Sequence, residues 1–306
     1  MRKLKTLSIV LFMVSAILFG ANLYKERIME DKMGPVFHMD SELAEISVKD
    51  AESALLKGVT AEDASDGDVT DSIIVEAISP FTGTGHRIVT YAAFDSNNHV
   101  THAKRELKYT DYEASRFHLS KHLSFPMNTT NLLEGITVTD YIDGDLTKSI
   151  KMMSDDQIDT AHVGEYSARL KVTNSAGGVS YLPVTVEIYD ASVRHKLPQI
   201  KLKENLIYVE KGDYFDEEEN LESITVSGTE YSLTEDKGTY DATYVPNDVT
   251  DKTINYDLVE IDSDVDTDVT GYYEVVYTFE DIVSSTGTGK ARLYVVVTEG
   301  GPAVNE

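Results

Sequence analysis

One sixteen-residue phrase occurs twice in this chain, and this repetition constrains the fold more than any other feature. Residues 58–73 (GVTAEDASDGDVTDSI) return as residues 135–150 (GITVTDYIDGDLTKSI), 77 positions later, with nine of the sixteen identical. The following stretch also recurs, because residues 85–100 line up with residues 164–179 at an offset of 79. Self-similarity at a period of this size indicates that one folding unit has been copied.

A third and more divergent copy is visible at GYYEVVYTF, residues 271–279. We therefore divide the chain into a hydrophobic segment and three modules: residues 1–27, then 35–109, 115–189 and 197–299. The third module carries an expansion at residues 227–260 that the other two lack. Because the linkers between modules are short, we expect neighbouring modules to stack end to end as a semi-rigid rod.

Alternating apolar residues predict β-strands, and helical periodicity is missing after residue 30. Two segments of the third module show the alternation most clearly, at Tyr273, Val275, Tyr277 and Phe279 and at Ala291, Leu293, Val295 and Val297. Burial of one strand face against a second sheet requires this period of two. We predict an all-β fold in which each module has about seven short strands, which suits an immunoglobulin-like β-sandwich.

The repeated phrase also carries a family resemblance. The motif GVTAxDxxDGDVT, followed by a glycine-led strand and a DSNN or NSAGG hairpin, resembles the bacterial immunoglobulin-like surface modules, which are related to hyalin-repeat domains and to modules of an insecticidal crystal protein. The first two modules match closely, and the third lacks Asp-Gly-Asp near residues 224–228. The resemblance implies tandem sandwiches that serve as spacers, adhesive units or ligand-binding appendages on exported bacterial proteins.

The amino terminus predicts an exported protein. Arg2, Lys3 and Lys5 precede an apolar run at residues 7–24. As a helix rising about 1.5 Å per residue, this run spans roughly 27 Å, which is enough for a bilayer core. Since the basic end stays in the cytoplasm, we expect a single anchor with the rest of the chain, including its carboxyl end, outside the bacterial membrane. A cleaved signal peptide, followed by secretion, is the alternative.

The chain is strongly acidic, with 53 Asp and Glu against 27 Lys and Arg and a formal net charge of −26. This balance argues against nucleic acid or an anionic surface as a direct ligand, because each would repel it. Cysteine is absent, so no disulfide or thiolate metal site exists, and absent tryptophan makes a sugar-stacking platform less favourable. We expect a protein or glycan partner at the cell exterior.

Carboxylates gather around a glycine in both copies of the repeated phrase. The candidates are Asp63, Asp66 and Asp68 in the first copy and Asp140, Asp143 and Asp145 in the second, with Asp95 in a neighbouring hairpin. Hard oxygen ligands in a loop are what Ca²⁺ prefers, so the turns are candidate calcium sites. The alternative is that these side chains accept hydrogen bonds from nearby backbone amides and build the turn without an ion.

Four tyrosines of the expansion are candidate partner-binding residues: Tyr231, Tyr240, Tyr244 and Tyr256. Tyrosine combines an apolar face with a hydroxyl and is common on adaptable binding surfaces. Alternatively, these rings pack an extra hairpin against the sandwich. His118 and His122 lie in a segment that reads as extended chain, where a spacing of four places no zinc pair on one face, so we interpret them as ordinary surface or boundary residues.

No catalytic motif stands out in the sequence. There is no Gly-x-Ser-x-Gly elbow, His-Glu-x-x-His pair or phosphate-binding glycine loop. We therefore predict a non-enzymatic bacterial surface stalk or adhesion protein. Two alternatives remain, namely a receptor module for polysaccharide or cell wall, and an exported hydrolase with its site in the third module, since paired carboxylates have no sequence signature.

Overall fold

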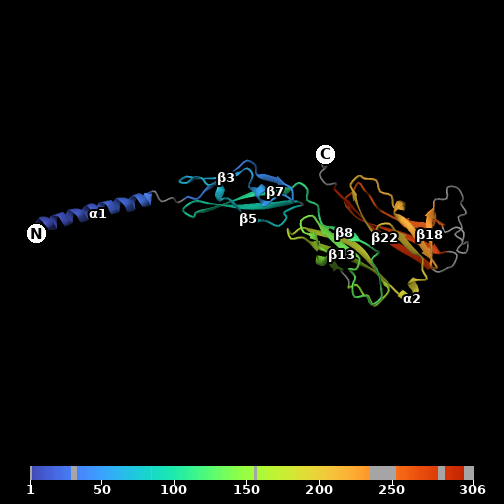
Figure 1. The fold of residues 1–306 in the computed structure, drawn as a ribbon. Coiled ribbons are helices and arrows are strands. Elements are labelled where there is room, and N and C mark those ends of the chain that lie inside the picture. The colour runs from blue at the N-terminus through green and yellow to red at the C-terminus, as the bar shows by residue number, and fades with distance from the viewer. Residues whose placement is uncertain are drawn as a thin grey trace. The chain divides into compact units, whose positions relative to one another are not determined.

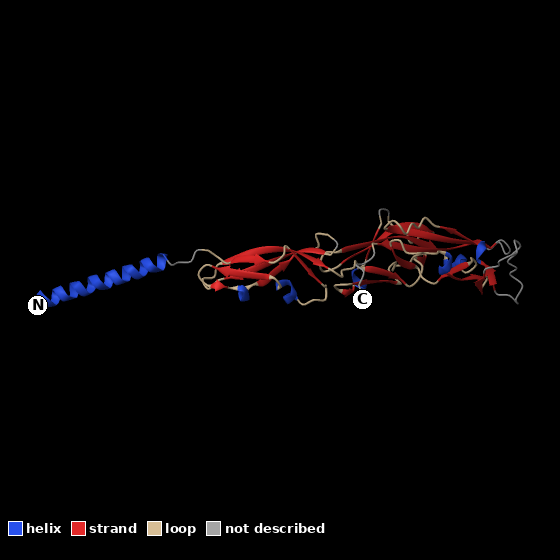
Figure 2. Cartoon of the chain, turned by 90° about the horizontal axis from the view of Figure 1, so that it is seen from above, coloured by secondary structure: helices blue, strands red, loops and turns tan. Residues whose placement is uncertain are grey.

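The computed structural model describes residues 2–28, 33–83, 85–154, 157–234, 253–281 and 287–299 (Figure 1). Beyond helix α1 (Arg2–Ile28), strands make up nearly all of the regular structure, as Figure 2 shows. The predicted all-β class is therefore confirmed. The chain forms two compact units, Met1–Tyr109 and Thr110–Glu306.

Helix α1 contains the apolar run of the amino terminus. Its Leu11 and Phe12 side chains are 71% and 74% exposed. Among the described residues, no helix combines the length and the apolar character that a membrane crossing needs. The N-terminal anchor stays a prediction.

The first unit holds one β-sandwich, called sandwich 1. Its smaller sheet has the order β1 (Val36–Met39), β3 (Val59–Asp63) and β4 (Gly67–Asp68). Its larger sheet has the order β2 (Leu43–Ile46), β7 (Val100–Tyr109), β6 (His86–Phe94) and β5 (Ile74–Ile78). Two 3-10 turns, η1 (Glu52–Leu56) and η2 (Thr70–Ser72), lie between strands.

The second unit begins with sandwich 2, which repeats this plan. The smaller sheet has the order β11 (Gly144–Asp145), β10 (Ile136–Asp140) and β8 (Arg116–Leu119). The larger sheet has the order β12 (Lys151–Met153), β13 (Gly164–Thr173), β14 (Val179–Tyr189) and β9 (Ser124–Pro126). The 3-10 turn η3 (Thr147–Ser149) corresponds to η2, so the copied sequence gives copied structure.

Sandwich 3 follows a short helix, α2 (Ala191–Arg194). One sheet has the order β15 (Gln199–Leu202), β17 (Leu221–Val226), β18 (Thr229–Thr234) and β19 (Thr253–Asn255). The other has the order β16 (Leu206–Glu210), β22 (Gly287–Thr298), β21 (Gly271–Asp281) and β20 (Val259–Asp262). The turns η4 (Glu218–Asn220) and η5 (Tyr256–Leu258) complete it.

The predicted alternation locates the core of sandwich 3. Val275, Tyr277 and Phe279 of β21 are at most 1% exposed, and Leu293 and Ala291 of β22, which pair with Val275 and Tyr277, are at most 3% exposed. Sandwich 1 has its own core around Tyr91, whose hydroxyl donates to the Leu55 carbonyl at 2.7 Å. Burial of this alternating set supplies the main driving force for each sandwich.

Candidate functional sites: the aspartate turns and the joint between sandwiches 2 and 3

The carboxylates of the repeated turn accept hydrogen bonds from the backbone. In sandwich 1, Asp63 Oδ1 accepts the amides of Ser65 at 2.8 Å and Asp66 at 3.0 Å. Asp66 reaches the hairpin between β6 and β7, where it accepts the amide and the hydroxyl of Ser96 at 2.7 and 2.9 Å. The turn is thus fastened to a hairpin 30 residues further along the chain.

Sandwich 2 repeats these bonds. Asp140 Oδ1 accepts the amides of Ile142 and Asp143 at 2.8 and 2.9 Å. Asp143 in turn accepts the amide and the hydroxyl of Ser175, both at 2.6 Å. Because the atoms and partners correspond, the sequence repeat preserves a hydrogen-bonded fastening as well as a chain path.

The third aspartate of each turn has a local role. Asp68 and Asp145 each accept the amide two residues later, from Thr70 and Thr147, at 2.9 Å. The hydrogen bond from the threonine side chain, and after it the bond from the threonine amide, lowers the pKa of each carboxyl. A carboxylate that caps a backbone amide is more stable in its charged form, so each turn favours ionised aspartate.

The hairpins behind the turns differ between the two copies. In sandwich 1, Asp95 Oδ1 accepts the amides of Asn97 and His99 at 2.9 and 2.7 Å, and Asp95 Oδ2 lies 2.6 Å from His99 Nδ1. Burial disfavours the charge on Asp95, but the bonds from His99 outweigh it and lower the pKa of Asp95. The hairpin of sandwich 1 therefore depends on an ionised carboxylate next to a histidine.

Sandwich 2 has a neutral side chain at the same place. Asn174 donates to Asp140 Oδ2 at 3.2 Å and to the Tyr112 hydroxyl at 3.1 Å, and its Oδ1 accepts the Gly178 amide at 2.7 Å. Ser115 Oγ also donates to Asp140 Oδ2, at 2.6 Å. Asp140 is 8% exposed and accepts four hydrogen bonds, so it connects turn, hairpin and the start of β8.

These contacts favour the ion-free interpretation of the turns. All seven aspartates that the sequence nominated as calcium ligands bond to backbone amides: Asp63, Asp66, Asp68, Asp95, Asp140, Asp143 and Asp145. Within the described part of the chain, no group of three or more histidine or acidic side chains is placed to hold a metal ion. The hydrogen bonds account for the turns without an ion, and calcium binding stays a prediction.

The nominated tyrosines have separate outcomes. Tyr231 lies on β18 opposite Ile224 of β17, is 5% exposed and belongs to the core of sandwich 3. A buried ring cannot meet a partner, so Tyr231 has the packing role that the sequence left open. Tyr240 and Tyr244 lie outside the described residues, and Tyr256 begins η5, with nothing described of its side chain.

Sandwiches 2 and 3 share a buried joint, which the sequence analysis did not foresee. Leu206 of β16 and Tyr294 and Val296 of β22 belong to the same apolar cluster as the core of sandwich 2. They lie on the outer face of their sheet and are at most 9% exposed. The contacts run along strands, so this pair packs laterally and the expected end-to-end stacking is wrong for it.

The sequence did contain a signal for this joint. Residues 293–297 of β22 are buried without a break, which means that both faces of the strand are covered. A continuous apolar run of this kind is typical of a strand with protein on both sides. The alternation rule identified the inner face of β22 and overlooked the outer one.

Two tyrosine hydroxyls complete strand edges of sandwich 2. Tyr294 Oη accepts the Thr185 amide at 2.9 Å and donates to the Thr185 carbonyl at 3.0 Å, in the part of β14 that β9 does not pair with. Tyr208 Oη accepts the Phe117 amide of β8 at 2.9 Å. Burial raises the pKa of Tyr208 to about 12 and also raises that of Tyr294, so both hydroxyls keep their protons.

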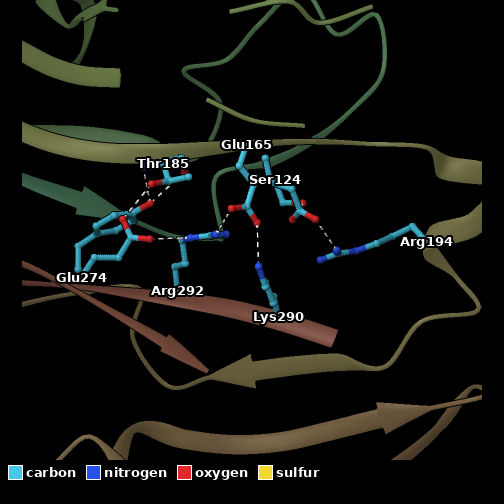
Figure 3. A network of polar contacts seen from close by, with 9 residues as sticks. Ser124, Glu165, Thr185, Arg194, Glu274, Lys290 and Arg292 are labelled. Carbon is cyan, nitrogen blue, oxygen red and sulfur yellow. Dashed lines mark hydrogen bonds and ion pairs between the residues drawn. The ribbon is translucent and has the colours of Figure 1, made fainter. Parts of the chain in front are cut away.

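Figure 3 shows a polar network of the joint, centred on Arg292. Arg292 lies between two carboxylates, with Glu274 at 2.6 Å and Glu165 of sandwich 2 at 2.7 Å. Glu274 also accepts the Thr185 hydroxyl at 2.9 Å. Burial disfavours the charge on Arg292, but Glu165 and Glu274 outweigh this effect and raise the pKa of Arg292. Its side chain is 11% exposed, so the network is partly shielded from solvent.

His122 lies in the same joint. Its Nδ1 is buried and, within the described residues, has no hydrogen-bond partner. Burial lowers the pKa of His122, and the charge of Arg194 acts in the same direction. Arg194 itself pairs with Glu187 at 2.9 Å. His122 is half-buried, which agrees with its interpretation as a surface or boundary residue, and residues of sandwich 3 line the pocket around it.

Comparisons with known proteins place the chain among similar sequences without assigning it to a family. No family model matches it. It is similar to pesticidal crystal protein Cry22Aa of Bacillus thuringiensis, with 28% identity over 250 residues, which is 80% of this chain. The chain spans about 30% of the length of that relative.

Solved structures give weaker similarities. One holds the CBM51-2 domain, in complex with GlcNAc, and INT domains of Clostridium perfringens ZmpB, with 18% identity, coverage of 48% of this chain and 26% of that chain, and a TM-score of 0.21. Another is Drosophila N-cadherin EC1-4, with 12% identity, coverage of 88% and 76%, and a TM-score of 0.21. At such TM-scores these similarities carry no argument about function.

Proposed function

We propose that the chain is a non-catalytic binding or adhesion protein of the bacterial exterior, built from tandem immunoglobulin-like β-sandwiches. The observation that carries the proposal is the joint between sandwiches 2 and 3. Its shared apolar cluster and its two buried tyrosine hydroxyls fasten two sandwiches into one body. A body of this kind can hold a recognition surface in a fixed orientation, which a flexible string of domains cannot do.

Two further observations support the proposal. The turns and hairpins of sandwiches 1 and 2 repeat the same fastening contacts, as is typical of structural modules copied in tandem. The similarity to Cry22Aa extends over 80% of the chain and so includes more than one sandwich. The exterior location rests on the basic and apolar amino terminus of the sequence.

The test combines location with binding. Intact cells that produce the full-length chain are treated with protease, and purified full-length chain is titrated onto wall glycan and onto host matrix proteins. We expect cleavage of the chain on intact cells and saturable binding to at least one of these surfaces. A chain that is protected in intact cells and binds none of the surfaces would contradict the proposal.

A further inference from the structure

One sheet face of sandwich 2 gathers cations in a chain that is otherwise strongly acidic. The register of β12, β13 and β14 places two rows side by side on the outer face: Lys151, Lys171 and Tyr181, then Met153, Arg169 and Pro183. The Lys171 and Arg169 cations lie 5.5 and 5.7 Å from the ring centroid of Tyr181. We call Lys151, Arg169, Lys171 and Tyr181 the basic sheet patch.

The three cations of this patch lack acidic partners. Within the described part of the chain, none of them forms an ion pair, whereas Arg194, Lys201 and Arg292 each contact a carboxylate within 2.9 Å. Lys151 and Lys171 even lie directly opposite each other on neighbouring strands, where like charges destabilise a sheet. The 53 acidic residues already give the chain the net charge that keeps a protein soluble, so solubility does not explain a group of cations without acidic partners.

The fold itself does not require the patch. The hairpins of sandwiches 1 and 2 match at an offset of 79, as the bonds Asp95 N to His99 O and Asn174 N to Gly178 O show. The row that corresponds to Lys151, Lys171 and Tyr181 consists in sandwich 1 of Ile74, Ala92 and His102. Since the same sheet forms with these residues, the charges of sandwich 2 serve something other than folding.

We propose that the basic sheet patch binds an acidic polysaccharide, a chain of sugars that carry carboxylate or sulfate groups. This inference rests on the proposed binding function and names a ligand class for it. Arginine and lysine supply charge-assisted hydrogen bonds to such anions, and arginine can do so bidentately. The apolar faces of sugar rings can pack on Met153, Val179 and Tyr181, which are 47%, 44% and 36% exposed on the same surface.

The dimensions and the charge favour a glycan over other polyanions. Two rows about 6.8 Å apart on strands about 4.8 Å apart give a flat footprint of roughly 7 by 10 Å, which suits a few sugar units. Three cations neutralise only a few phosphates, whereas the affinity of a nucleic acid depends on many such contacts. Because charges are screened beyond about 8 Å in physiological salt, the patch still attracts a short anionic segment.

The experiment measures affinity of the full-length chain for three polymers: polygalacturonate, dextran sulfate and unmodified dextran. The variants are Lys151→Gln, Arg169→Gln and Lys171→Gln, singly and together. The matched control is Lys104→Gln, which removes one charge from the corresponding sheet of sandwich 1, where Lys104 pairs with Thr90. Melting temperatures of all variants are recorded, and removing a like-charge neighbour should leave them unchanged or slightly raised.

We expect binding to at least one anionic polymer and none to dextran. Each single variant should weaken binding by about 3- to 10-fold, the triple variant should abolish it, and the control should match the parent chain. The relative affinities for the two anionic polymers identify carboxylate or sulfate as the preferred group.

Several outcomes would overturn the inference: equal binding to dextran, triple-variant affinity equal to that of the parent, or tighter binding to polyglutamate or single-stranded DNA than to either anionic glycan. If the triple variant keeps its attachment to wall glycan or matrix protein, the patch assignment fails while the proposed function stands. If the parent chain attaches to no surface, the proposed function fails as well.

Discussion

Sandwiches 1 and 2 are copies of one unit, yet they complete their strand edges in different ways. In sandwich 1 the Glu106 amide of β7 bonds to the Glu42 carbonyl of the same sandwich at 3.0 Å. The corresponding residue of sandwich 2, Thr185, instead bonds to the hydroxyl of Tyr294 in sandwich 3. Sandwich 2 keeps an equivalent strand bond two residues later, where the Glu187 amide bonds to the Leu123 carbonyl at 2.9 Å, so only the stretch at Thr185 depends on a neighbour.

This difference teaches that the two copies keep the same turn contacts but differ in the groups that complete their strand edges. The aspartate and serine contacts are the same in both copies, because losing one would leave amides of the turn or hairpin without their acceptor. An edge strand tolerates more change, since any donor and acceptor of suitable geometry can complete it. In this chain the joint lies at such an edge, where Tyr294 bonds to Thr185.

The largest expected effect tests the dependence of sandwich 2 on its neighbour. Replacing Tyr294 by Ala removes a buried ring and leaves the Thr185 amide and carbonyl without their partner. We expect a loss of about 3–5 kcal/mol in the free energy of unfolding of the second unit, while Tyr294→Phe costs about 1–2 kcal/mol. Calorimetry of the full-length chain should show the transition of the first unit unchanged, and a shift of both transitions would break the comparison.

A second substitution sharpens the contrast between the two hairpins. Asp140→Ala removes the acceptor of four hydrogen bonds in sandwich 2, so we expect a loss of about 2–4 kcal/mol in unfolding free energy. Asp140→Asn keeps the shape of the side chain and should lose less. Denaturant unfolding followed by tyrosine fluorescence measures both, and equal losses in the two variants would argue against a requirement for the carboxylate.

A smaller effect concerns pH and the joint. Because burial lowers the pKa of His122 in the folded chain, the unfolded chain binds a proton first as the pH falls below about 6.5, and stability of the second unit decreases from that point. The charged residues that line the pocket around His122 are Glu187, Arg194, Lys290 and Arg292. We expect His122→Gln to flatten the decline in melting temperature between about pH 6.5 and 5. An unaltered slope would show that other groups cause it.

The smallest expected effect is that of calcium. Because every nominated aspartate already bonds to backbone amides, we expect the same melting temperature in millimolar Ca²⁺ and in chelator, for both units. A rise with Ca²⁺ that disappears in Asp66→Ala or Asp143→Ala would restore the calcium prediction for the corresponding sandwich.

The features that could be predicted from the sequence are those that depend on local patterns, such as strand alternation and the repeated turn. The period of two identified the buried residues of β21 and β22, such as Tyr277 and Leu293, and the repeated phrase identified the equivalent turns. It also gave the ion-free role of the aspartates as an alternative, which the hydrogen bonds of Asp63 and Asp140 now favour. These features depend on neighbours a few residues away or on one strand face.

The joint could not be predicted in the same way. Tyr208 and Tyr294 contact strands about 90 and 109 residues distant, and an outward aromatic residue on a strand does not name its partner. The half-buried position of His122 agrees with the predicted boundary residue, but the contact with sandwich 3 that covers it was missed for the same reason. The basic sheet patch was hidden too, because Lys151 and Lys171 come together only when β12 and β13 pair.

The hydroxyl of Tyr294 has a consequence for how these molecules stay separate. Had the free stretch of β14 been completed by another strand, that strand would have offered a fresh row of donors and acceptors, and the pairing could have continued from molecule to molecule. The Tyr294 hydroxyl accepts one hydrogen bond and donates one, and it presents no further row of backbone donors and acceptors. Strand pairing therefore ends at this stretch of β14, and the joint between the two sandwiches offers no new strand edge there to another molecule.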